Sequence, residues 1–152
     1  MSQLYIDASV VLRILFSEPG PRAPLTRKTV AVSSELIQVE CFRALDHTRL
    51  AGHLDDLQMA RKSKELFGLL ATLHLFPISA EVLQFARATF PIKVRALEAL
   101  HVATAQSVAD EVGPLDFWTH DEQQASAATV RGLEVHGLAS IHQQSPSSRV
   151  RR

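Results

Sequence analysis

The sequence has one cysteine, no long apolar run and no net charge, and each of these features excludes or disfavours some kinds of protein. The single cysteine, Cys41, cannot form an internal disulfide bond, and a cysteine-based zinc site would need a second thiol. Asp7 interrupts the apolar start of the chain, and no later run is long enough to span a bilayer. We therefore expect neither a signal peptide nor a membrane-spanning helix, and we predict a cytoplasmic protein.

The absence of net charge bears on nucleic-acid binding. The chain has 16 Lys and Arg residues against 16 Asp and Glu residues, whereas nucleic-acid-binding domains usually carry an excess of basic residues. If several carboxylates were gathered around divalent cations, the remaining surface would be net basic. The net charge of the whole chain would then not describe the surface that RNA meets. The charge balance therefore permits an RNA partner without demonstrating one.

What the sequence does contain is a regular alternation of strand and helix patterns along its 152 residues. Short apolar runs predict strands, and the segments between them have the periodicity of amphipathic helices. We expect the strands at residues 4–6, 30–32, 74–78, 116–119 and 133–135. Because strands separated by helices need crossover connections, this order predicts one α/β domain built on a parallel sheet.

The first predicted strand ends in a carboxylate. The apolar run Leu4–Ile6 stops at Asp7, and helix-forming sequence follows over Ser9–Leu15. In an open parallel sheet, ligands bind beyond the carboxyl ends of the strands, so Asp7 lies where a site is expected. The alternative is that Asp7 only caps the helix that follows it.

Two further acids occupy unusual places on predicted helices. Glu40 lies on a long helix, about 60° around the axis from the buried line through Ile37, and so borders the buried face. Glu98 stands near the start of the helix at residues 94–105, which is apolar or small on nearly every side. A carboxylate there is costly unless it is paired, and Arg95 is its alternative, purely structural partner.

A fourth acid follows a strand, as Asp7 does. Asp121 comes directly after the strand at 116–119, although Asp121 and Gln124 also fit a capping box at the start of a helix. His101, one turn after the acid of the apolar helix, is predicted to be a hydrogen-bonded core or rim histidine rather than a metal ligand.

Binding of a divalent cation would explain why all four acids occur at these positions. Carboxylates brought close together repel one another and stay ionised only when a cation lies among them. Mg²⁺ and Mn²⁺ prefer oxygen ligands and leave positions for water and a phosphate, whereas zinc would favour His or Cys. The set therefore predicts a magnesium or manganese site formed by Asp7, Glu40, Glu98 and Asp121.

Four stretches carry these acids, namely Leu4–Ser9 (LYIDAS), Glu40–Leu45 (ECFRAL), Arg95–Ala105 (RALEALHVATA) and Trp118–Asp121 (WTHD). In this order, and in a chain of this size, they resemble the PIN-domain family, and more narrowly the VapC-type ribonuclease toxins of toxin–antitoxin pairs. The resemblance implies a PIN-like three-layer α/β/α sandwich with a parallel sheet of four to five strands. It implies a nuclease domain at residues 1–137, and we expect residues 138–152 to form a flexible tail.

The resemblance also implies roles for individual residues. The catalytic acids that hold Mg²⁺ (or Mn²⁺) and hydrolyse RNA phosphodiester bonds would be Asp7, Glu40, Glu98 and Asp121. Ser9 and Thr119 would support the acids, and Arg43 and Arg95 would contact RNA phosphates. The family usually has Asp at the position of Glu98, so the longer side chain would reach the metal through water or bind it more weakly.

The partners implied by the resemblance are an RNA substrate, a cognate antitoxin that blocks the active-site groove, and a second copy of the chain in a homodimer. The alternative from another class is a PIN-like module that binds RNA or protein without catalytic turnover, which the Glu98 substitution would allow. A haloacid-dehalogenase-like phosphatase is disfavoured, because it needs a second Asp where this chain has Ser9. A response-regulator receiver is disfavoured because its acid pair and late Lys are not evident.

Overall fold

Strand β1 (Ser2–Ile6) lies at the centre of a five-stranded sheet in the computed structural model, which describes residues 2–139. The strand order is β3-β2-β1-β4-β5, and every pairing is parallel. The other strands are β2 (Thr29–Ser34), β3 (His74–Phe76), β4 (Asp116–Trp118) and β5 (Glu134–His136). The predicted parallel α/β fold is therefore confirmed, with five strands.

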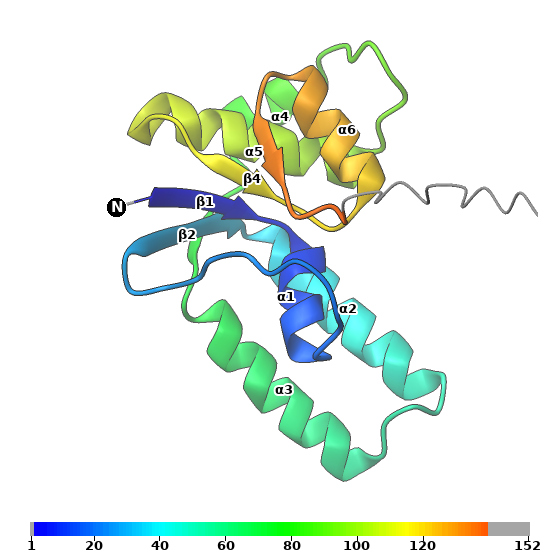
Figure 1. The fold of residues 1–152 in the computed structure, drawn as a ribbon. Coiled ribbons are helices and arrows are strands. Elements are labelled where there is room, and N and C mark those ends of the chain that lie inside the picture. The colour runs from blue at the N-terminus through cyan, green and yellow to red at the C-terminus, as the bar shows by residue number, and fades with distance from the viewer. Residues whose placement is uncertain (1, 140–152) are drawn as a thin grey trace, which may run out of the picture.

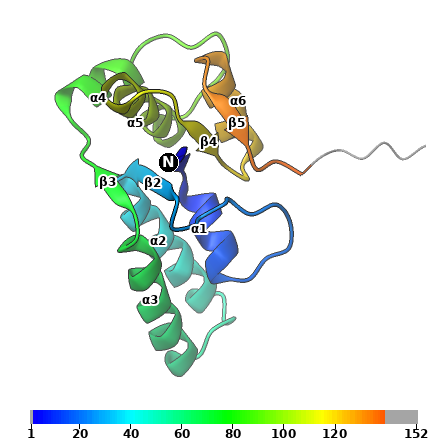
Figure 2. The ribbon, with the colours of Figure 1, turned by 60° about the vertical axis from the view of Figure 1, so that its left-hand side comes forward.

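Six helices cover the two faces of the sheet and complete a three-layer sandwich (Figure 1). One face carries α1 (Ala8–Leu15), α2 (Leu36–Leu50) and α3 (Asp56–Leu70), and the other carries α4 (Ala80–Ala86), α5 (Ala96–Val112) and α6 (Glu122–Val130). The rotated view separates the same two groups, with α2 and α3 packed side by side (Figure 2). The sandwich predicted from the resemblance is thus present.

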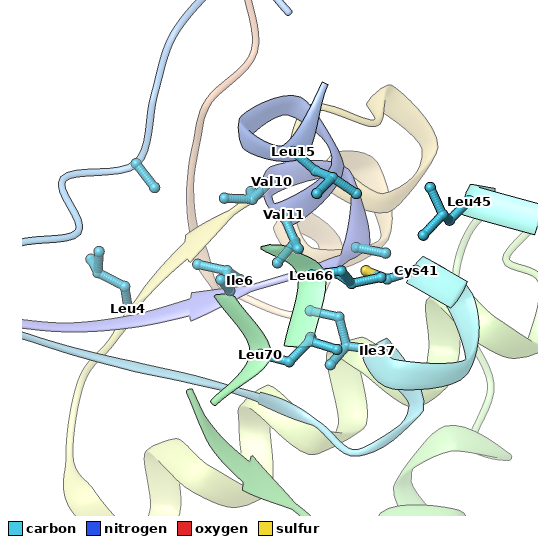
Figure 3. Close-up of a cluster of buried hydrophobic side chains, with 12 residues drawn as sticks. Leu4, Ile6, Val10, Val11, Leu15, Ile37, Cys41, Leu45, Leu66 and Leu70 are labelled. Atoms are coloured by element: carbon cyan, nitrogen blue, oxygen red, sulfur yellow. The ribbon is translucent and has the colours of Figure 1, made fainter. Parts of the chain in front are cut away.

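The alternation of side chains along β1 divides the hydrophobic core into two parts. Leu4 and Ile6 face α1, α2 and α3, where they join ten other buried residues (Figure 3). Tyr5 points to the opposite face, where its ring stacks on Phe117 with centroids 5.0 Å apart. Burial of a large apolar side chain contributes about 1.5–3 kcal/mol, so both faces hold the central strand in place.

The start of α2 differs from its predicted form. The residues Ser33-Ser34-Glu35 favour an N-cap, and the Ser34 hydroxyl does accept a hydrogen bond of 3.2 Å from the backbone N–H of Leu36, but Ser33 and Ser34 belong to β2 and are fully buried. Strand β2 extends this far because its last residues pair with Leu75 and Phe76 of β3. Glu35 is the N-cap, and its carboxylate accepts a hydrogen bond from the backbone N–H of Ile78 instead of capping the helix.

Other features of the chain follow the sequence prediction more closely. Pro77 predicts a strand that is short or at an edge, and β3 is both. Among the described residues, no helix combines the length and the apolar character needed to cross a bilayer. The flexible tail expected at residues 138–152 lies almost entirely outside the described residues and stays a prediction.

Candidate active site

Asp7 links β1 to α1 at the carboxyl end of the central strand. It occupies the N-cap position of α1, but its side chain makes no capping hydrogen bond, so the purely capping alternative is wrong. Instead, Oδ1 accepts a hydrogen bond of 2.5 Å from the Ser9 hydroxyl, and Oδ2 accepts one of 2.5 Å from the Thr119 hydroxyl. Both residues that the resemblance assigns to a supporting role therefore contact Asp7.

The carboxylate of Asp7 is 5% exposed, and its burial has an electrostatic cost. Burial raises the pKa of Asp7, against the opposing effects of the hydrogen bonds from the Ser9 and Thr119 hydroxyls. An ionised Asp7 would be stabilised by positive charge at its side chain. This is the electrostatic condition that a divalent cation would satisfy.

Asp121 is joined to Asp7 through Thr119. The hydroxyl oxygen of Thr119 accepts a hydrogen bond of 3.0 Å from the backbone N–H of Asp121. The Oδ1 atom of Asp121 accepts one of 2.8 Å from the backbone N–H of Gln124 at the start of α6, so the predicted capping role is also present. Asp121 is exposed, and one of its carboxylate oxygens serves the cap.

Glu40 approaches the site from α2. Its Oε1 atom lies 2.5 Å from Nε2 of His101 on α5, and the Nδ1 atom of His101 lies 2.7 Å from the Tyr5 hydroxyl. Burial, followed by the charges of Glu40 and Asp7, raises the pKa of the neighbouring Cys41 thiol to about 12. The carboxylates of Glu40 and Asp7 are therefore both near enough to Cys41 for their charges to raise the pKa of its thiol. His101 is 1% exposed, which confirms the prediction of a hydrogen-bonded core histidine.

Glu98 lies in the first turn of α5, and its side chain is 15% exposed. Its Oε2 atom accepts a hydrogen bond of 2.9 Å from the backbone N–H of Arg95, while Oε1 lies 4.0 Å from Nε of Arg95. The structural partner considered for Glu98 is thus present, mainly through the backbone. Glu98 also lines an open cavity of about 650 Å³ together with Lys93 and Gln123.

No three of the four predicted acids place ligand atoms within 4.8 Å of one another. Among residues 2–139, the one group of three His, Cys, Asp or Glu ligand atoms within 4.8 Å of one another is Asp116, Glu134 and His136, at the edge formed by β4 and β5. Those side chains are 36–76% exposed, and Nε2 of His136 lies 3.5 Å from a carboxylate oxygen of Asp116 and 3.5 Å from one of Glu134. None of the four predicted acids belongs to that group.

The donor chemistry of the predicted site nevertheless fits a hard cation. Its ligands would all be carboxylate oxygens, which Mg²⁺ and Mn²⁺ prefer. The capping bonds of Glu98 and Asp121 each engage one oxygen, and the other oxygen of Glu98 has only a long contact of 4.0 Å with the Arg95 guanidinium. Mg²⁺ usually keeps several water molecules and binds through one or two carboxylates, so wider spacing of the remaining acids is compatible with it.

Comparison with known proteins identifies the family. A family model described as the PIN domain matches residues 4–129, which span all four acids. The chain belongs to the PIN domain family. Ribonuclease VapC46 of Mycobacterium tuberculosis is 33% identical to this PIN domain over 138 residues, covering 89% of this chain and 97% of that protein. The family predicted from the four sequence stretches is therefore confirmed.

Two solved structures share the fold of this PIN domain. PAE2754 from Pyrobaculum aerophilum has a TM-score of 0.52 at 17% identity, covering 88% of this chain and 83% of the other. VapBC-5 from Mycobacterium tuberculosis, a member of the VapBC family of toxin–antitoxin systems, has a TM-score of 0.51 at 16% identity, covering 91% and 99%. At these identities the similarity shows the fold alone.

One hydrogen-bonded neighbour of the candidate site, Tyr5, is not predicted by the sequence patterns. Its hydroxyl lies between the backbone N–H of Ser34, at 3.2 Å, and the ring of His101. A signal was available, because a buried tyrosine and a buried histidine both need hydrogen-bond partners. The two could have been paired once Tyr5 was assigned to the face of the sheet that α5 covers.

Proposed function

We propose that this PIN domain is an endoribonuclease that uses Mg²⁺ or Mn²⁺ to hydrolyse RNA phosphodiester bonds. The observation that carries the proposal is Asp7: a buried carboxylate at the end of the central strand, held by two hydroxyl groups instead of by a basic side chain. The relationship to a protein named as a ribonuclease supports the substrate class.

The position of each acid indicates its role in binding the cation. Asp7 would be the central ligand, because it is the most buried and its orientation is fixed from both sides. The acids Glu40, Glu98 and Asp121 would complete the cation's surroundings directly or through water. When bound, the cation supplies the positive charge that makes water a nucleophile at neutral pH and that neutralises charge developing on the phosphate.

Two arginines near the acids are suited to bind the RNA backbone. Arg43 follows Glu40 by one turn and is 64% exposed, although it also pairs with Asp46 at 3.3 Å. Arg95 is 71% exposed, and its guanidinium donates a hydrogen bond of 2.7 Å to Gln123 at the cavity beside Glu98. Positive charge at these places would hold phosphates that flank the bond to be cleaved.

The biological role proposed for the enzyme is that of the toxin in a toxin–antitoxin pair. Similarity to VapC46, and a shared fold with a VapBC toxin–antitoxin member, support this assignment. The partners would be RNA, a cognate antitoxin that covers the acidic groove, and a second copy of the chain. The enzyme would act in the cytoplasm, where its RNA substrate is available.

The second candidate function is a PIN-like binding module without turnover. One observation favours it: Glu98, which stands where the family usually has Asp, is drawn back to the helix terminus by the backbone N–H of Arg95. Replacement of Glu98 by Asp distinguishes the two functions. An enzyme retains or gains cleavage on Glu98→Asp and loses it on Glu98→Gln, whereas a binding module cleaves RNA in neither form.

The experiment that tests the proposed enzyme is cleavage of a fluorescently labelled single-stranded RNA with Mg²⁺, Mn²⁺ or EDTA. We expect cleavage with either cation, none in EDTA and none by Asp7→Asn. The matched control is Asp116→Asn, which removes a partly exposed acid from the far end of β4. Cleavage that persists in EDTA, or that Asp7→Asn leaves unchanged, would overturn the proposal.

A further inference from the structure

A chain of hydrogen bonds leads from Tyr5 through His101 to Glu40. His101 lies fully buried in the second turn of α5, and its two ring nitrogens face different elements. Nε2 lies 2.5 Å from Oε1 of Glu40 on α2, and Nδ1 lies 2.7 Å from the hydroxyl of Tyr5 on β1. The hydroxyl oxygen of Tyr5 also accepts a hydrogen bond of 3.2 Å from the backbone N–H of Ser34 at the end of β2. Four elements therefore meet along this chain of hydrogen bonds.

The direction of each bond follows from its donors and acceptors. An ionised carboxylate can only accept, so Nε2 of His101 carries a hydrogen and donates it to Glu40. The Tyr5 oxygen accepts from the N–H of Ser34, and its hydroxyl hydrogen is free to donate to Nδ1 when the imidazole is neutral and carries its hydrogen on Nε2. The Tyr5 hydroxyl thus matches the tautomer of His101 that donates to Glu40, and the contacts at both ring nitrogens hold the ring plane.

Glu40 gains its orientation from this chain of hydrogen bonds. Its side chain is 22% exposed at the border between the core and solvent, and a glutamate there has several rotamers available. Among the described residues, His101 is the one side chain that forms a hydrogen bond or an ion pair with the Glu40 carboxylate. A carboxylate that binds a cation has to be held in position, and hydrogen-bonded neighbours usually hold it.

We propose that His101 is a positioning residue for the metal site: it anchors Oε1 of Glu40 and leaves the second carboxylate oxygen available to a cation, while the Tyr5 hydroxyl matches the tautomer that donates to Glu40. His101 does not itself bind the cation, because both ring nitrogens already have protein partners. The inference rests on the proposed metal-dependent activity and adds to it a side chain remote from the RNA.

The test measures Mn²⁺ binding to the full-length protein by isothermal titration calorimetry, without RNA, together with the melting temperature. His101→Ala is expected to weaken Mn²⁺ binding by about 10–100-fold, the usual effect of removing a hydrogen-bonded neighbour of a metal ligand. Tyr5→Phe keeps the imidazole and should weaken binding by a smaller factor. His101→Gln can place an N–H where Nε2 stands and should recover most of the affinity.

The matched control is Val102→Ala. Val102 is the next residue on α5, is fully buried in the core beside Tyr5, and has no side-chain atom that can form a hydrogen bond. This change should lower the melting temperature and leave Mn²⁺ binding unaltered. If His101→Ala and Tyr5→Phe lower only the melting temperature, as Val102→Ala does, His101 is structural and the inference is overturned. If the unmodified chain neither binds Mn²⁺ nor cleaves RNA, the proposed function itself fails.

Discussion

The hydroxyl of Thr119 donates a hydrogen bond of 2.5 Å to Oδ2 of Asp7, which precedes it by 112 positions in the chain. The sheet explains the contact. Strands β1 and β4 are parallel neighbours in which Ile6 pairs with Trp118, so the residues that follow each strand end side by side. The central acid is therefore positioned by the register of two strands and is independent of loop conformation.

Thr119→Val tests this contact. Valine keeps the shape of the side chain but removes the donor to Asp7 and the acceptor for the N–H of Asp121. We expect metal affinity to fall about 10–100-fold, and the free energy of unfolding to fall by about 1–3 kcal/mol because a buried group loses its partner. Calorimetry with Mn²⁺ and denaturant unfolding check the two effects. Thr129→Val, whose hydroxyl bonds only within α6, should change neither by as much.

Asp7→Asn tests the electrostatic cost of burying the Asp7 carboxylate. Burial raises the pKa of Asp7, so the folded protein binds a proton there more tightly than the unfolded chain does. Without metal, stability therefore falls as pH rises from the ordinary carboxyl pKa through the raised value of the folded state, and the loss persists at neutral pH. Removal of the charge should raise the melting temperature in EDTA at pH 7, by about 2–4 °C for a gain of ~1 kcal/mol.

Melting curves between pH 4 and pH 8 provide the check. The Asp7→Asn protein should show a flatter pH dependence in EDTA than the unmodified chain. Added Mn²⁺ should raise the melting temperature of the unmodified chain alone, because a ligand stabilises only the state that binds it. A lower melting temperature for Asp7→Asn at pH 7 would mean that the carboxylate is needed for folding.

Gly137→Ala tests whether the backbone behind Thr119 matters. Gly137 has φ +100°, and a Cβ atom there would lie 2.6 Å from the carbonyl oxygen of Thr119. We expect the collision to displace Thr119 from Asp7 and to reduce RNA cleavage at a temperature where the protein is still folded. Gly132→Ala is the control, because Gly132 also has positive φ, at +80°, but its Cβ would meet no atom within 4 Å. Equal loss of cleavage in both variants would contradict the prediction.

Arg95→Ala and Arg43→Ala test the proposed contacts with RNA. Each change should weaken binding of single-stranded RNA about equally for different sequences and lower the slope of log affinity against log salt by about 1. Metal binding should be unaffected. Fluorescence anisotropy at several salt concentrations measures the slope. Arg61→Ala, an exposed arginine on α3, should leave the slope unchanged, and an equal effect there would indicate diffuse attraction by surface charge.

The fold could be predicted largely from local patterns. Leu4–Ile6 is apolar and ends at an acid, and the helix patterns between the strands require crossovers, so the parallel sheet and the place of Asp7 follow from the sequence. The extension of β2 through Ser34 could not be predicted, because it depends on pairing with β3 some forty residues later. Local preference favoured a helix cap there, and the sheet prevailed.

The candidate site was less accessible to sequence reasoning. Its four acids could be selected by position and resemblance, but the sequence does not reveal which carboxylate oxygens are already engaged. The sequence offered Arg95 as a partner of Glu98 and a capping box for Asp121 with Gln124, but which oxygen each contact engages depends on side-chain rotamers. The link from Tyr5 to His101 joins residues 96 positions apart and follows only from the packing of α5 on the sheet.

Anomalous X-ray diffraction from crystals soaked in Mn²⁺ tests most directly whether one cation lies among the four acids. We predict a manganese peak at the carboxylate of Asp7, with Glu40, Glu98 and Asp121 around it either directly or through water. The peak should disappear in Asp7→Asn crystals. A peak only at Asp116, Glu134 and His136, or no peak at a saturating concentration of Mn²⁺, would contradict a metal-dependent active site at Asp7.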